Sequence, residues 1–523
     1  MENRKTEKAI LEIKNKIVSG EIKTKKDLEK FKAKVAKKYG LGRIIKNSEI
    51  LERMSSEEKE KFLHILIKRP VRSISGVCVV AVMTPPQNCP GQCIYCPGGK
   101  TSPKSYTGKE PAAMRAGMFD YDAYKQVRFR LEQLEKIGHN TEKVEIIIMG
   151  GTFLSLKKED REKFVKGIYD ALNGEISPSL EDAKLKNEKA KHRCVALTVE
   201  TRPDFCGKKE ILEMLNYGTT RVEIGVQVLN DEIYEFVKRG HTVKDVVNAT
   251  KLLKDSGLKV VYHLMPGLFQ TPEEDIRMFK KVFADERFKP DMIKIYPALV
   301  VKGTKLYEMW KEGKYKPLED DEAAELIAKV KEFVPVWCRI MRVQRDIPAY
   351  LIEAGVKSSN LRELVLEKAK EKGIKCRCIR CREAGHKWLK ERILPKKAEI
   401  MVRCYKASKG KEYFISYEDE EQDILLGFCR LRIPDFENVF IDEIKESGIV
   451  RELKVFGFSL NLGKKDKFSF QHRGIGRMLM EKAEEICKEE GLKKISVIAA
   501  IGTREYYKKL GYKKGKYYMV KEI

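Results

Sequence analysis

Three cysteines with the spacing C-x3-C-x2-C are the first feature of the sequence that could do chemistry. Cys89, Cys93 and Cys96 stand in a short segment, residues 88–99, that is rich in proline and glycine. Three thiolates can ligate three irons of a [4Fe–4S] cluster and leave the fourth iron open to a small molecule. A fourth thiolate would close a zinc site or a fully ligated cluster. The alternative, a zinc knuckle lacking one ligand, leaves the open position unexplained.

A second cysteine cluster lies in a basic segment further along the chain. Cys376, Cys378 and Cys381 are followed by His386. Three cysteines and one histidine form the closed four-ligand set of a structural zinc site. Free thiols in a basic loop are the alternative. The spacing is tighter than in common zinc fingers, but ligands on a turn can manage it, and we expect zinc here.

A glycine-rich turn near the C-terminus predicts a phosphate site. Its pattern is Q-x-x-G-x-G, with Gln471, Gly474 and Gly476 at the fixed positions, and it opens an amphipathic helical stretch. Backbone N–H groups and the helix dipole bind phosphates at such turns. Tyr507, or Tyr506 beside it, is a candidate proton donor in the following segment "REYYKKLGY". The alternative is that both tyrosines pack against the last strand.

The elements that must position these residues alternate between strands and helices. Six apolar, β-rich runs recur between about residues 74 and 345, and amphipathic helical stretches separate most of them. This alternation predicts a parallel sheet covered by helices, open or as a partial barrel, with its site at the carboxyl ends of the strands. The three-cysteine loop follows the first run and should lie at that edge.

Polar residues and glycines at the ends of the later runs should lie at the same edge as the cysteines. They are Gly150, Gly151, Thr152, Glu200, Arg202, Glu223 and Gln227. The glycines let a ligand approach the backbone closely, because they have no Cβ. The charged side chains could bind cofactor or substrate, or they could form ion pairs inside the barrel mouth.

The whole chain divides into four predicted parts. Residues 1–73 form a basic helical region, 74–345 the partial barrel, 346–393 a basic connector with the second cysteine cluster, and 394–523 an α+β domain that begins with antiparallel strands. Apolar residues at helical spacing and a stop at Gly40 predict two helices at the start. This first part is either a solvated helical surface or an arm that binds nucleic acid.

The amino-acid composition limits the kinds of partner that the protein could bind. The 523-residue chain has a formal net charge of +27, which predicts attraction to a polyanion, most simply nucleic acid. A heat-adapted protein would explain the 35% of charged residues but not their sign. The longest apolar runs are too short for a membrane span, and no secretory signal is visible at the N-terminus. We therefore expect a cytoplasmic protein without a membrane partner.

Two motifs resemble known families. The cysteine loop after the first strand, with Tyr95 before its last cysteine, resembles the radical S-adenosylmethionine superfamily, and "MGGT" resembles the glycine-rich segment of that superfamily that meets the cofactor's amino group. The Q-x-x-G-x-G turn resembles motif A of the GNAT acetyltransferases, which holds the pyrophosphate of coenzyme A. With "SYTGKEPAAMRA", "ETRPDF", "RGHTV", "KIYPALVVKGT" and "RVQRDIPA" in this order, the chain resembles the Elongator catalytic-subunit family from about residue 70 onward.

This resemblance implies an enzyme that modifies the wobble uridine, U34, of tRNA. The implied fold is a partial (β/α)6 TIM-like radical S-adenosylmethionine barrel followed by an α+β GNAT domain. The implied cofactors are a [4Fe–4S] cluster, S-adenosylmethionine and acetyl-CoA as co-substrate. An adenosyl radical would abstract hydrogen from the acetyl methyl group, and the carbon radical would add to uridine C5 to form the carboxymethyl precursor.

The resemblance also implies the residues that bind these groups. The cluster ligands fall on Cys89, Cys93 and Cys96. The acetyl-CoA contacts fall on Lys143, Glu452, Leu453, Lys454, Val455, Ile475, Gly476, Arg477 and Tyr507. Lys143 belongs to the barrel, so its assignment would put the two active sites in contact. The basic arm and connector would grip the anticodon stem-loop of tRNA.

Other functions and partners stay open at this point. The need for Elongator-type partner subunits is not decided by the sequence. A protein lysine acetyltransferase with a structural iron–sulfur cluster is an alternative, and it predicts acetyl transfer to a peptide without S-adenosylmethionine. A non-catalytic tRNA-binding scaffold is a third, although the complete ligand set and both glycine turns argue against it.

Overall fold

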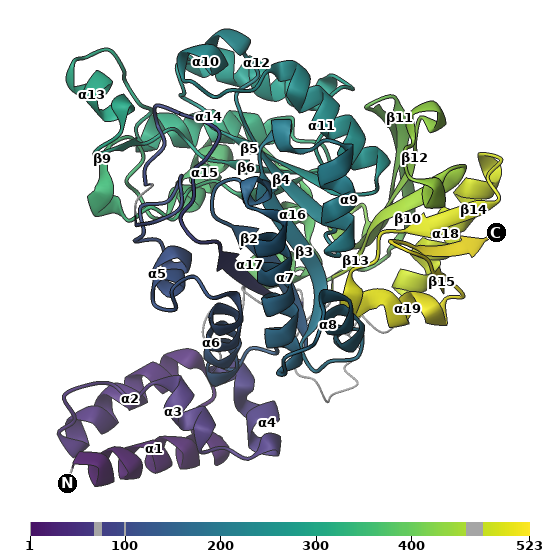
Figure 1. The fold of residues 1–523 in the computed structure, drawn as a ribbon. Coiled ribbons are helices and arrows are strands. Elements are labelled where there is room, and N and C mark those ends of the chain that lie inside the picture. Colours follow the sequence, from purple (N-terminus) through teal and green to yellow (C-terminus); the bar gives the residue numbers. More distant parts are fainter. Residues whose placement is uncertain (1, 67–75, 99–100, 457–473) are drawn as a thin grey trace.

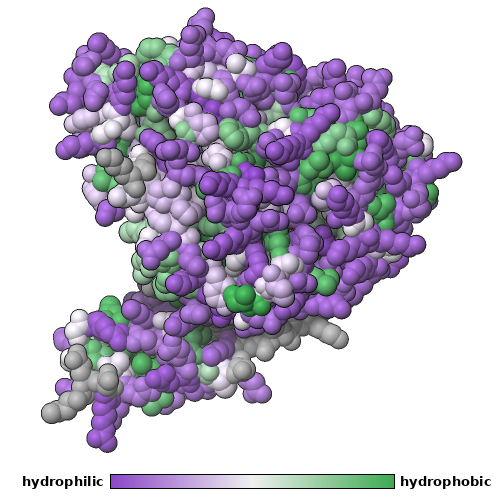
Figure 2. Space-filling view, viewed as in Figure 1, coloured by the Kyte–Doolittle hydropathy of each residue, from purple (hydrophilic) through white to green (hydrophobic). Residues whose placement is uncertain are grey.

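A computed structural model of the chain describes residues 2–66, 76–98, 101–456 and 474–523. The N-terminal helices project from a larger body that holds two seven-stranded sheets (Figure 1). Hydrophilic side chains cover most of the face in Figure 2, and its surface is hollowed between the N-terminal helices and the larger body. No helix within the described ranges is both long and apolar enough to cross a membrane.

Four helices with their own apolar core form the N-terminal part. They are α1 (Glu2–Val18), α2 (Lys25–Tyr39), α3 (Asn47–Glu52) and α4 (Ser56–Leu66). Ile10, Ile13 and Ile17 recur at helical spacing and are buried in this core. Gly40 ends α2 in the left-handed conformation with a φ of 60°, which glycine adopts without strain. Both predicted helices are therefore present.

Seven parallel strands form the first sheet, in the order β1-β2-β3-β4-β5-β6-β8. The strands are β1 (Cys78–Met83), β2 (Lys143–Met149), β3 (Arg193–Thr201), β4 (Arg221–Gln227), β5 (Lys259–Leu264), β6 (Met292–Ile295) and β8 (Arg339–Arg342). All six predicted strands are present. The seventh, β8, was missed because four residues, "RIMR", give no apolar run. The edge strands β1 and β8 do not pair, so the barrel is partial.

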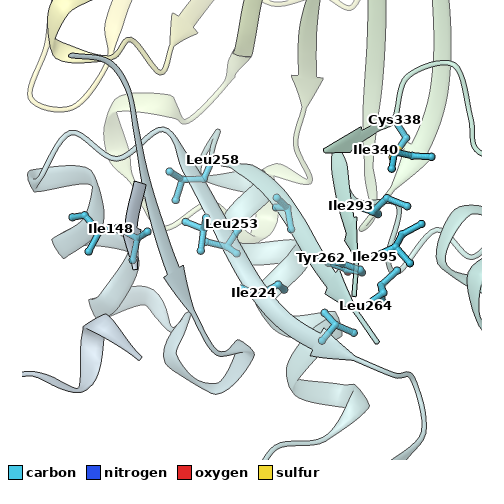
Figure 3. Packing of buried hydrophobic residues seen from close by; sticks show 14 of the residues in the cluster. Ile148, Ile224, Leu253, Leu258, Tyr262, Leu264, Ile293, Ile295, Cys338 and Ile340 are labelled. Atoms are coloured by element: carbon cyan, nitrogen blue, oxygen red, sulfur yellow. The ribbon is translucent and has the colours of Figure 1, made fainter. Parts of the chain in front are cut away.

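Helices cover the outer face of this sheet (Figure 1). The helices of this part of the chain, not all of which cover the sheet, are α5 (Pro111–Gly117), α6 (Ala123–Lys136), α7 (Lys158–Asn173), α8 (Leu180–Asn187), α9 (Lys208–Asn216), α10 (Asp231–Phe236), α11 (Val243–Asp255), α12 (Pro272–Ala284), α13 (Lys305–Lys311), α14 (Asp320–Glu332) and α15 (Leu361–Glu371). Figure 3 shows Ile224, Tyr262, Leu264 and Ile293 in the core between sheet and helices. Each is fully buried and contributes about 1.5–3 kcal/mol of apolar stabilisation.

Short elements connect this sheet to the second one. They are the strand pair β7 (Val300–Val301) and β9 (Ile352–Ala354), and the helices α16 (Ile379–Arg382) and α17 (Ala384–Glu391). The second cysteine cluster lies at α16.

The second sheet is mixed and has the order β10-β11-β12-β13-β14-β16-β15. Its strands are β10 (Glu399–Ala407), β11 (Gly410–Asp419), β12 (Ile424–Ile433), β13 (Ser447–Val455), β14 (Lys494–Val497), β15 (Lys513–Lys514) and β16 (Met519–Glu522). Helices α18 (Ile475–Glu489) and α19 (Arg504–Lys509) belong to it. The strands β10 to β13 pair antiparallel, and β13 pairs with β14 in parallel. This agrees with the predicted α+β domain.

A buried network of ion pairs joins the two sheets. Arg451 of β13 donates at 2.9 Å to Asp291, which precedes β6, and at 2.9 Å to Glu412 of β11. Arg432 of β12 donates at 2.9 Å to both Glu412 and Asp255 of α11. All five side chains are almost fully buried. Charges in a dry interior must be paired, so this network fixes one sheet against the other.

Removing one carboxylate from this network should destabilise the protein. Loss of one partner of a buried pair costs about 3–5 kcal/mol, so Asp291→Asn should lower the thermal unfolding midpoint at pH 7 by several degrees. Asp285→Asn is the matched control, because Asp285 forms an exposed pair with Arg287. An equal midpoint for both variants would contradict the role of the network.

The same carboxylate should make stability depend on pH. Burial opposes ionisation of Asp291, but Arg451 and Lys254 outweigh it and hold its pKa below the usual range. Its contribution is therefore complete above the pKa of an unfolded aspartate, about 4, and is lost as the pH falls further. Between pH 7 and pH 3 the unfolding midpoint of the native protein should fall more than that of Asp291→Asn. An equal fall would contradict this assignment.

Candidate functional site

The three cysteines and the predicted strand-end residues line one cavity at the carboxyl ends of the parallel strands. The predicted residues among its walls are Cys89, Cys93, Cys96, Gly151, Thr152, Glu200, Arg202, Glu223 and Gln227. Gly150 lies behind this wall with a φ of 122°, and a Cβ there would lie 2.1 Å from the hydroxyl oxygen of Thr84. The position therefore requires glycine. We call this cavity the cysteine pocket.

The turn after α10 holds the cysteine loop. The backbone N–H of Ile94 donates to the carbonyl of Val237 at 3.1 Å. The guanidinium of Arg239 donates to the Cys93 sulfur at 3.4 Å and to the carbonyl of Gly225 at 2.5 Å. Arg239 is buried, so its charge lies directly behind the thiol group.

These surroundings give the cysteines unequal acidities. Burial disfavours the Cys93 thiolate, but the positive charge of Arg239 outweighs it and holds the Cys93 pKa below its usual value. Burial, followed by the nearby Cys93, raises the pKa of Cys96 to about 11. A metal cluster that accepts thiolates would remove this penalty, because the metal charge replaces the missing solvation.

The residues of the cysteine pocket fit a [4Fe–4S] cluster. The guanidiniums of Arg202 and Arg239 each keep a buried nitrogen without a hydrogen-bond partner, which suits an anionic cluster. A zinc ion at about 2.3 Å from each thiolate would draw the sulfurs to roughly 3.8 Å from one another. The sulfurs of Cys376, Cys378 and Cys381 all lie within 4.8 Å of each other. In the described part of the chain, the sulfurs of Cys89, Cys93 and Cys96 do not form such a close group.

A buried acid–base cluster forms the floor of the cysteine pocket. Glu223 accepts a hydrogen bond from His263 at 2.7 Å and pairs closely with Lys294. Lys294 also lies 3.2 Å from Glu200, which accepts from the hydroxyl of Tyr106 at 3.0 Å. Burial opposes ionisation of Glu223, but Lys294 and His263 hold its pKa below the usual range. Glu200, Glu223 and His263 could hold a metal ion by geometry, yet the amine of Lys294 already pairs with both carboxylates.

A second cavity at the amino ends of the strands brings Lys143 together with the second sheet. The walls from the parallel sheet include Lys143, Glu145 and Arg221. The walls from β13 are Glu452, Leu453, Lys454 and Val455. The structure thus places Lys143 of the barrel in one cavity with the four residues of β13 that the family resemblance assigned to acetyl-CoA. We call this cavity the interdomain pocket.

The glycine turn adjoins the same end of β13. Gly474 begins α18 with a φ of 78°, and Ile475 is buried behind it. A Cβ on Gly476 would lie 3.7 Å from the Val455 side chain and 2.6 Å from the hydroxyl oxygen of Tyr506. Bare backbone at this helix start can therefore meet a phosphate.

Three further predicted contacts differ in their surroundings. Arg477 is exposed and donates to Glu481 on the same helix at 2.8 Å. Tyr507 is buried in the core of the second sheet, whereas Tyr506 beside it is 40% exposed. Burial, with Cys429 nearby, raises the pKa of Tyr507. Gln471 lies outside the described residues.

The structure does not complete the predicted four-ligand zinc set. Cys376, Cys378 and Cys381 gather at α16, and the amine of Lys331 lies 3.6 Å from the Cys381 sulfur. His386 does not join them. It lies on α17 with its ring nitrogen 3.9 Å from Glu383, and it lines the interdomain pocket.

Sequence reasoning missed several polar and charged residues of these cavities. They are Tyr106, Glu145, Arg221, Arg239, His263, Lys294 and Arg339. The available signal was charge inside apolar strands. In "RVEIGVQ" and "MIKIYPAL" charged residues alternate with apolar ones, which places them on the inner face of the barrel.

Comparisons with known proteins identify the domains. The chain matches the Radical SAM superfamily over residues 83–282, the Radical SAM C-terminal domain over 290–371, the ELP3 N-terminal domain over 6–74 and the Acetyltransferase (GNAT) family over 466–512. The predicted pairing of a radical S-adenosylmethionine barrel with a GNAT domain is thereby confirmed.

Similar proteins cover nearly the whole chain. The chain is 53% identical over 518 residues to the tRNA uridine(34) acetyltransferase of Methanocaldococcus infernus, covering 96% of each protein. It is 44% identical over 510 residues to Elongator complex protein 3 of Homo sapiens, covering 95% of this chain and 93% of that protein. The solved structure of archaeal Methanocaldococcus infernus Elp3 with an N-terminal deletion (1-46) has a TM-score of 0.78 at 51% identity, covering 86% of this chain and 100% of that one.

Arg239 should set the redox potential of a cluster held by the three cysteines. A charge-assisted hydrogen bond to a thiolate is worth about 1.5–3 kcal/mol, which corresponds to roughly 60–130 mV for one electron. Arg239→Gln should therefore lower the midpoint potential of the reconstituted cluster by about that amount in a spectroscopic redox titration. Arg287→Gln, which lines neither cavity, is the control. An unchanged potential in Arg239→Gln would contradict the assignment.

Proposed function

Because the chain belongs to the family of the tRNA uridine(34) acetyltransferases and Elongator complex protein 3, we propose that it modifies the wobble uridine, U34, of tRNA with acetyl-CoA as co-substrate. The modification is the carboxymethyl precursor at uridine C5. One observation carries the proposal beyond family membership. The cysteine pocket and the interdomain pocket lie at opposite ends of the interior of one parallel sheet.

One buried side chain in the interior of the barrel spans the distance between the two cavities. Arg221 lines the interdomain pocket and pairs closely with Glu145 there. Its guanidinium also lies 3.5 Å from Glu223, which lines the cysteine pocket. A single buried side chain therefore touches a wall of each cavity. This short separation supports a reaction that uses both sites on one substrate.

Each cavity has a chemical role in the proposal. When bound, a [4Fe–4S] cluster with S-adenosylmethionine supplies a radical that can attack an unactivated C–H bond. Cys89, Cys93 and Cys96 would hold the cluster, with Arg239 behind Cys93. Glu200 and Glu223 would orient polar groups of S-adenosylmethionine or substrate, because both are fixed by Lys294.

The second sheet would hold acetyl-CoA and open its thioester. The backbone at Gly474 and Gly476 would meet the pyrophosphate, and β13 would pair with the pantetheine arm. The hydroxyl of Tyr507 carries its proton at neutral pH, as an ordinary tyrosine does. It is the group that would donate a proton to the departing coenzyme A sulfur. Lys143, which lines the interdomain pocket from the barrel side, would lie beside the acyl end of acetyl-CoA.

tRNA binding completes the proposal. The net charge of +27 and the hollow beside the N-terminal helices in Figure 2 support a polyanionic partner that spans this face. A tRNA substrate also supports a cytoplasmic location. Elongator-type partner subunits are a further part of the proposal, supported by the similarity to Elongator complex protein 3.

Single substitutions should separate the two half-reactions. Under anaerobic conditions with tRNA, acetyl-CoA and S-adenosylmethionine, Cys93→Ala should lose 5′-deoxyadenosine formation but still release coenzyme A. Tyr507→Phe should slow coenzyme A release by about 10²–10⁴-fold and keep reductive cleavage of S-adenosylmethionine. Both variants should lose the modified nucleoside in mass spectra of digested tRNA.

Two controls sharpen this experiment. Tyr506→Phe tests the neighbouring hydroxyl, and Tyr512→Phe removes a hydroxyl that is bonded to Glu484 at 2.8 Å; neither should stop coenzyme A release. Acetyl transfer to a lysine peptide at full rate without S-adenosylmethionine would contradict the proposal and favour a protein lysine acetyltransferase.

A structural zinc ion at the second cysteine cluster is also part of the proposal. The close spacing of Cys376, Cys378 and Cys381 supports it, since tetrahedral zinc needs thiolates at such separations. A zinc ion there would hold α16 beside α14, which carries Lys331.

Zinc analysis distinguishes this three-thiolate set from the four-ligand set predicted by the sequence. Cys378→Ser should lose most of the bound zinc, because a hydroxyl is a poor zinc ligand. His386→Ala should keep it, because His386 does not reach the three sulfurs. Atomic emission of purified protein measures both. Loss of zinc from His386→Ala would restore the four-ligand set.

A further inference from the structure

A third cavity adjoins the cysteine pocket. The two share Arg342, which ends β8, and Arg345, Asp346 and Ile347, which follow it. The remaining walls of the third cavity come mainly from this segment, from residues 357–362 at the start of α15, and from Arg380 of α16. We call it the arginine pocket. A ligand that leaves the cysteine pocket along this wall enters it directly.

The walls of the arginine pocket carry an excess of positive charge. Its five cationic side chains are Arg342, Arg345, Lys357, Arg362 and Arg380, and its one acidic side chain is Asp346. Asp346 pairs with Arg342. In the described part of the chain, no carboxylate forms an ion pair with any of the other four. Most cations elsewhere in the interior of this protein have such partners, so the imbalance is local.

Arg362 and Arg380 show the cost of this imbalance. Both are only partly exposed and line the same cavity. In the described part of the chain neither guanidinium has a carboxylate partner, so two positive charges share one partly buried cavity. Because guanidiniums resist deprotonation, a bound anion would relieve their repulsion.

Hydrogen bonds fix the orientation of two of these arginine side chains. Arg362 donates one N–H to the carbonyl of Met341 at 3.1 Å, and Arg345 donates to the Ser105 hydroxyl oxygen at 3.1 Å. Their other donors remain available. A guanidinium fork held at one end suits bidentate contact with a phosphate, whereas a lysine would act only as a point charge.

We propose that the arginine pocket binds a backbone phosphodiester of the anticodon loop, next to the nucleotide that enters the cysteine pocket. This inference rests on the proposed function, because it assumes a tRNA substrate. Backbone phosphates fix the register of a nucleic acid, while the pocket that receives the base reads its identity. The contact would place one nucleotide at the reacting centre and exclude its neighbours.

A phosphate of coenzyme A has the same chemistry and is the competing source. Arg380 also lines the interdomain pocket, so Arg380 alone does not distinguish an RNA phosphate from a coenzyme A phosphate. The other four cations do not line that pocket, and two of them, Arg342 and Arg345, line the cysteine pocket. The charge therefore faces the radical site, which favours the RNA backbone.

Binding of tRNA by full-length Arg362→Gln and Arg380→Gln tests the proposal. Each variant should bind tRNA roughly tenfold more weakly at moderate salt, the loss expected for one charged contact. The slope of log affinity against log salt should shrink by about 0.7–1 for each lost phosphate contact. Arg287→Gln is the control and should change neither quantity. Lys357→Gln, on the exposed rim, provides a second variant if either arginine variant has a lowered melting temperature.

Chemically altered RNA identifies the phosphate. Anticodon stem-loops with one neutral methylphosphonate near U34 should bind the native protein more weakly at one position. At that position Arg362→Gln should show no further loss. Additive losses at every position would overturn the proposal, as would unchanged tRNA affinity and salt slope in all three pocket variants.

Two further measurements separate the remaining outcomes. Calorimetric affinity for acetyl-CoA should be equal in the native protein and in Arg362→Gln, because Arg362 lines the arginine pocket but not the interdomain pocket. Weaker acetyl-CoA binding with unchanged tRNA binding would assign the phosphate to coenzyme A and overturn the RNA assignment. Failure of the native protein to modify U34 would defeat the proposed function itself, whereas native activity with fully normal variants would defeat only this inference.

Discussion

The buried ion pairs between the two sheets are the constraint on which the rest of the structure depends. Asp255 and Asp291 come from the barrel side, and Glu412, Arg432 and Arg451 from the second sheet. Hydrophobic contact alone would let the sheets slide, whereas paired charges in a dry interface accept one geometry. That geometry sets β13 against the amino ends of the parallel strands, and so it creates the interdomain pocket.

This placement gives each end of the barrel a distinct task. The carboxyl ends carry the cysteine loop, as expected for parallel α/β folds. The amino ends, which in most barrels serve stability, here meet the end of β13 and, next to it, the start of α18. Charged side chains such as Arg221 and Glu223 fill the space between. The structure thereby unites two chemistries that separate enzymes usually carry.

Much of the fold and of the candidate site could be predicted from the sequence, because the patterns that indicate them lie within short segments. The spacing of Cys89, Cys93 and Cys96, the glycine turn at Gly474 and the apolar strand runs are each readable within a few residues. Arg239, Lys294 and the arginine pocket could not be predicted, since their roles come from contacts between segments far apart in the chain. His386 is close in sequence to Cys381 and was predicted as a fourth ligand, but in this structure it lies on α17 outside the group of three sulfurs.

The central claim is that both cavities act on the same acetyl group. Anaerobic turnover with acetyl-CoA carrying three deuteriums on its methyl group tests this most directly, with mass spectrometry of both products. The account predicts that 5′-deoxyadenosine gains one deuterium and that the modified U34 keeps two. Unlabelled 5′-deoxyadenosine together with a modified nucleoside would show that the methyl group never reaches the radical site, and would contradict the account.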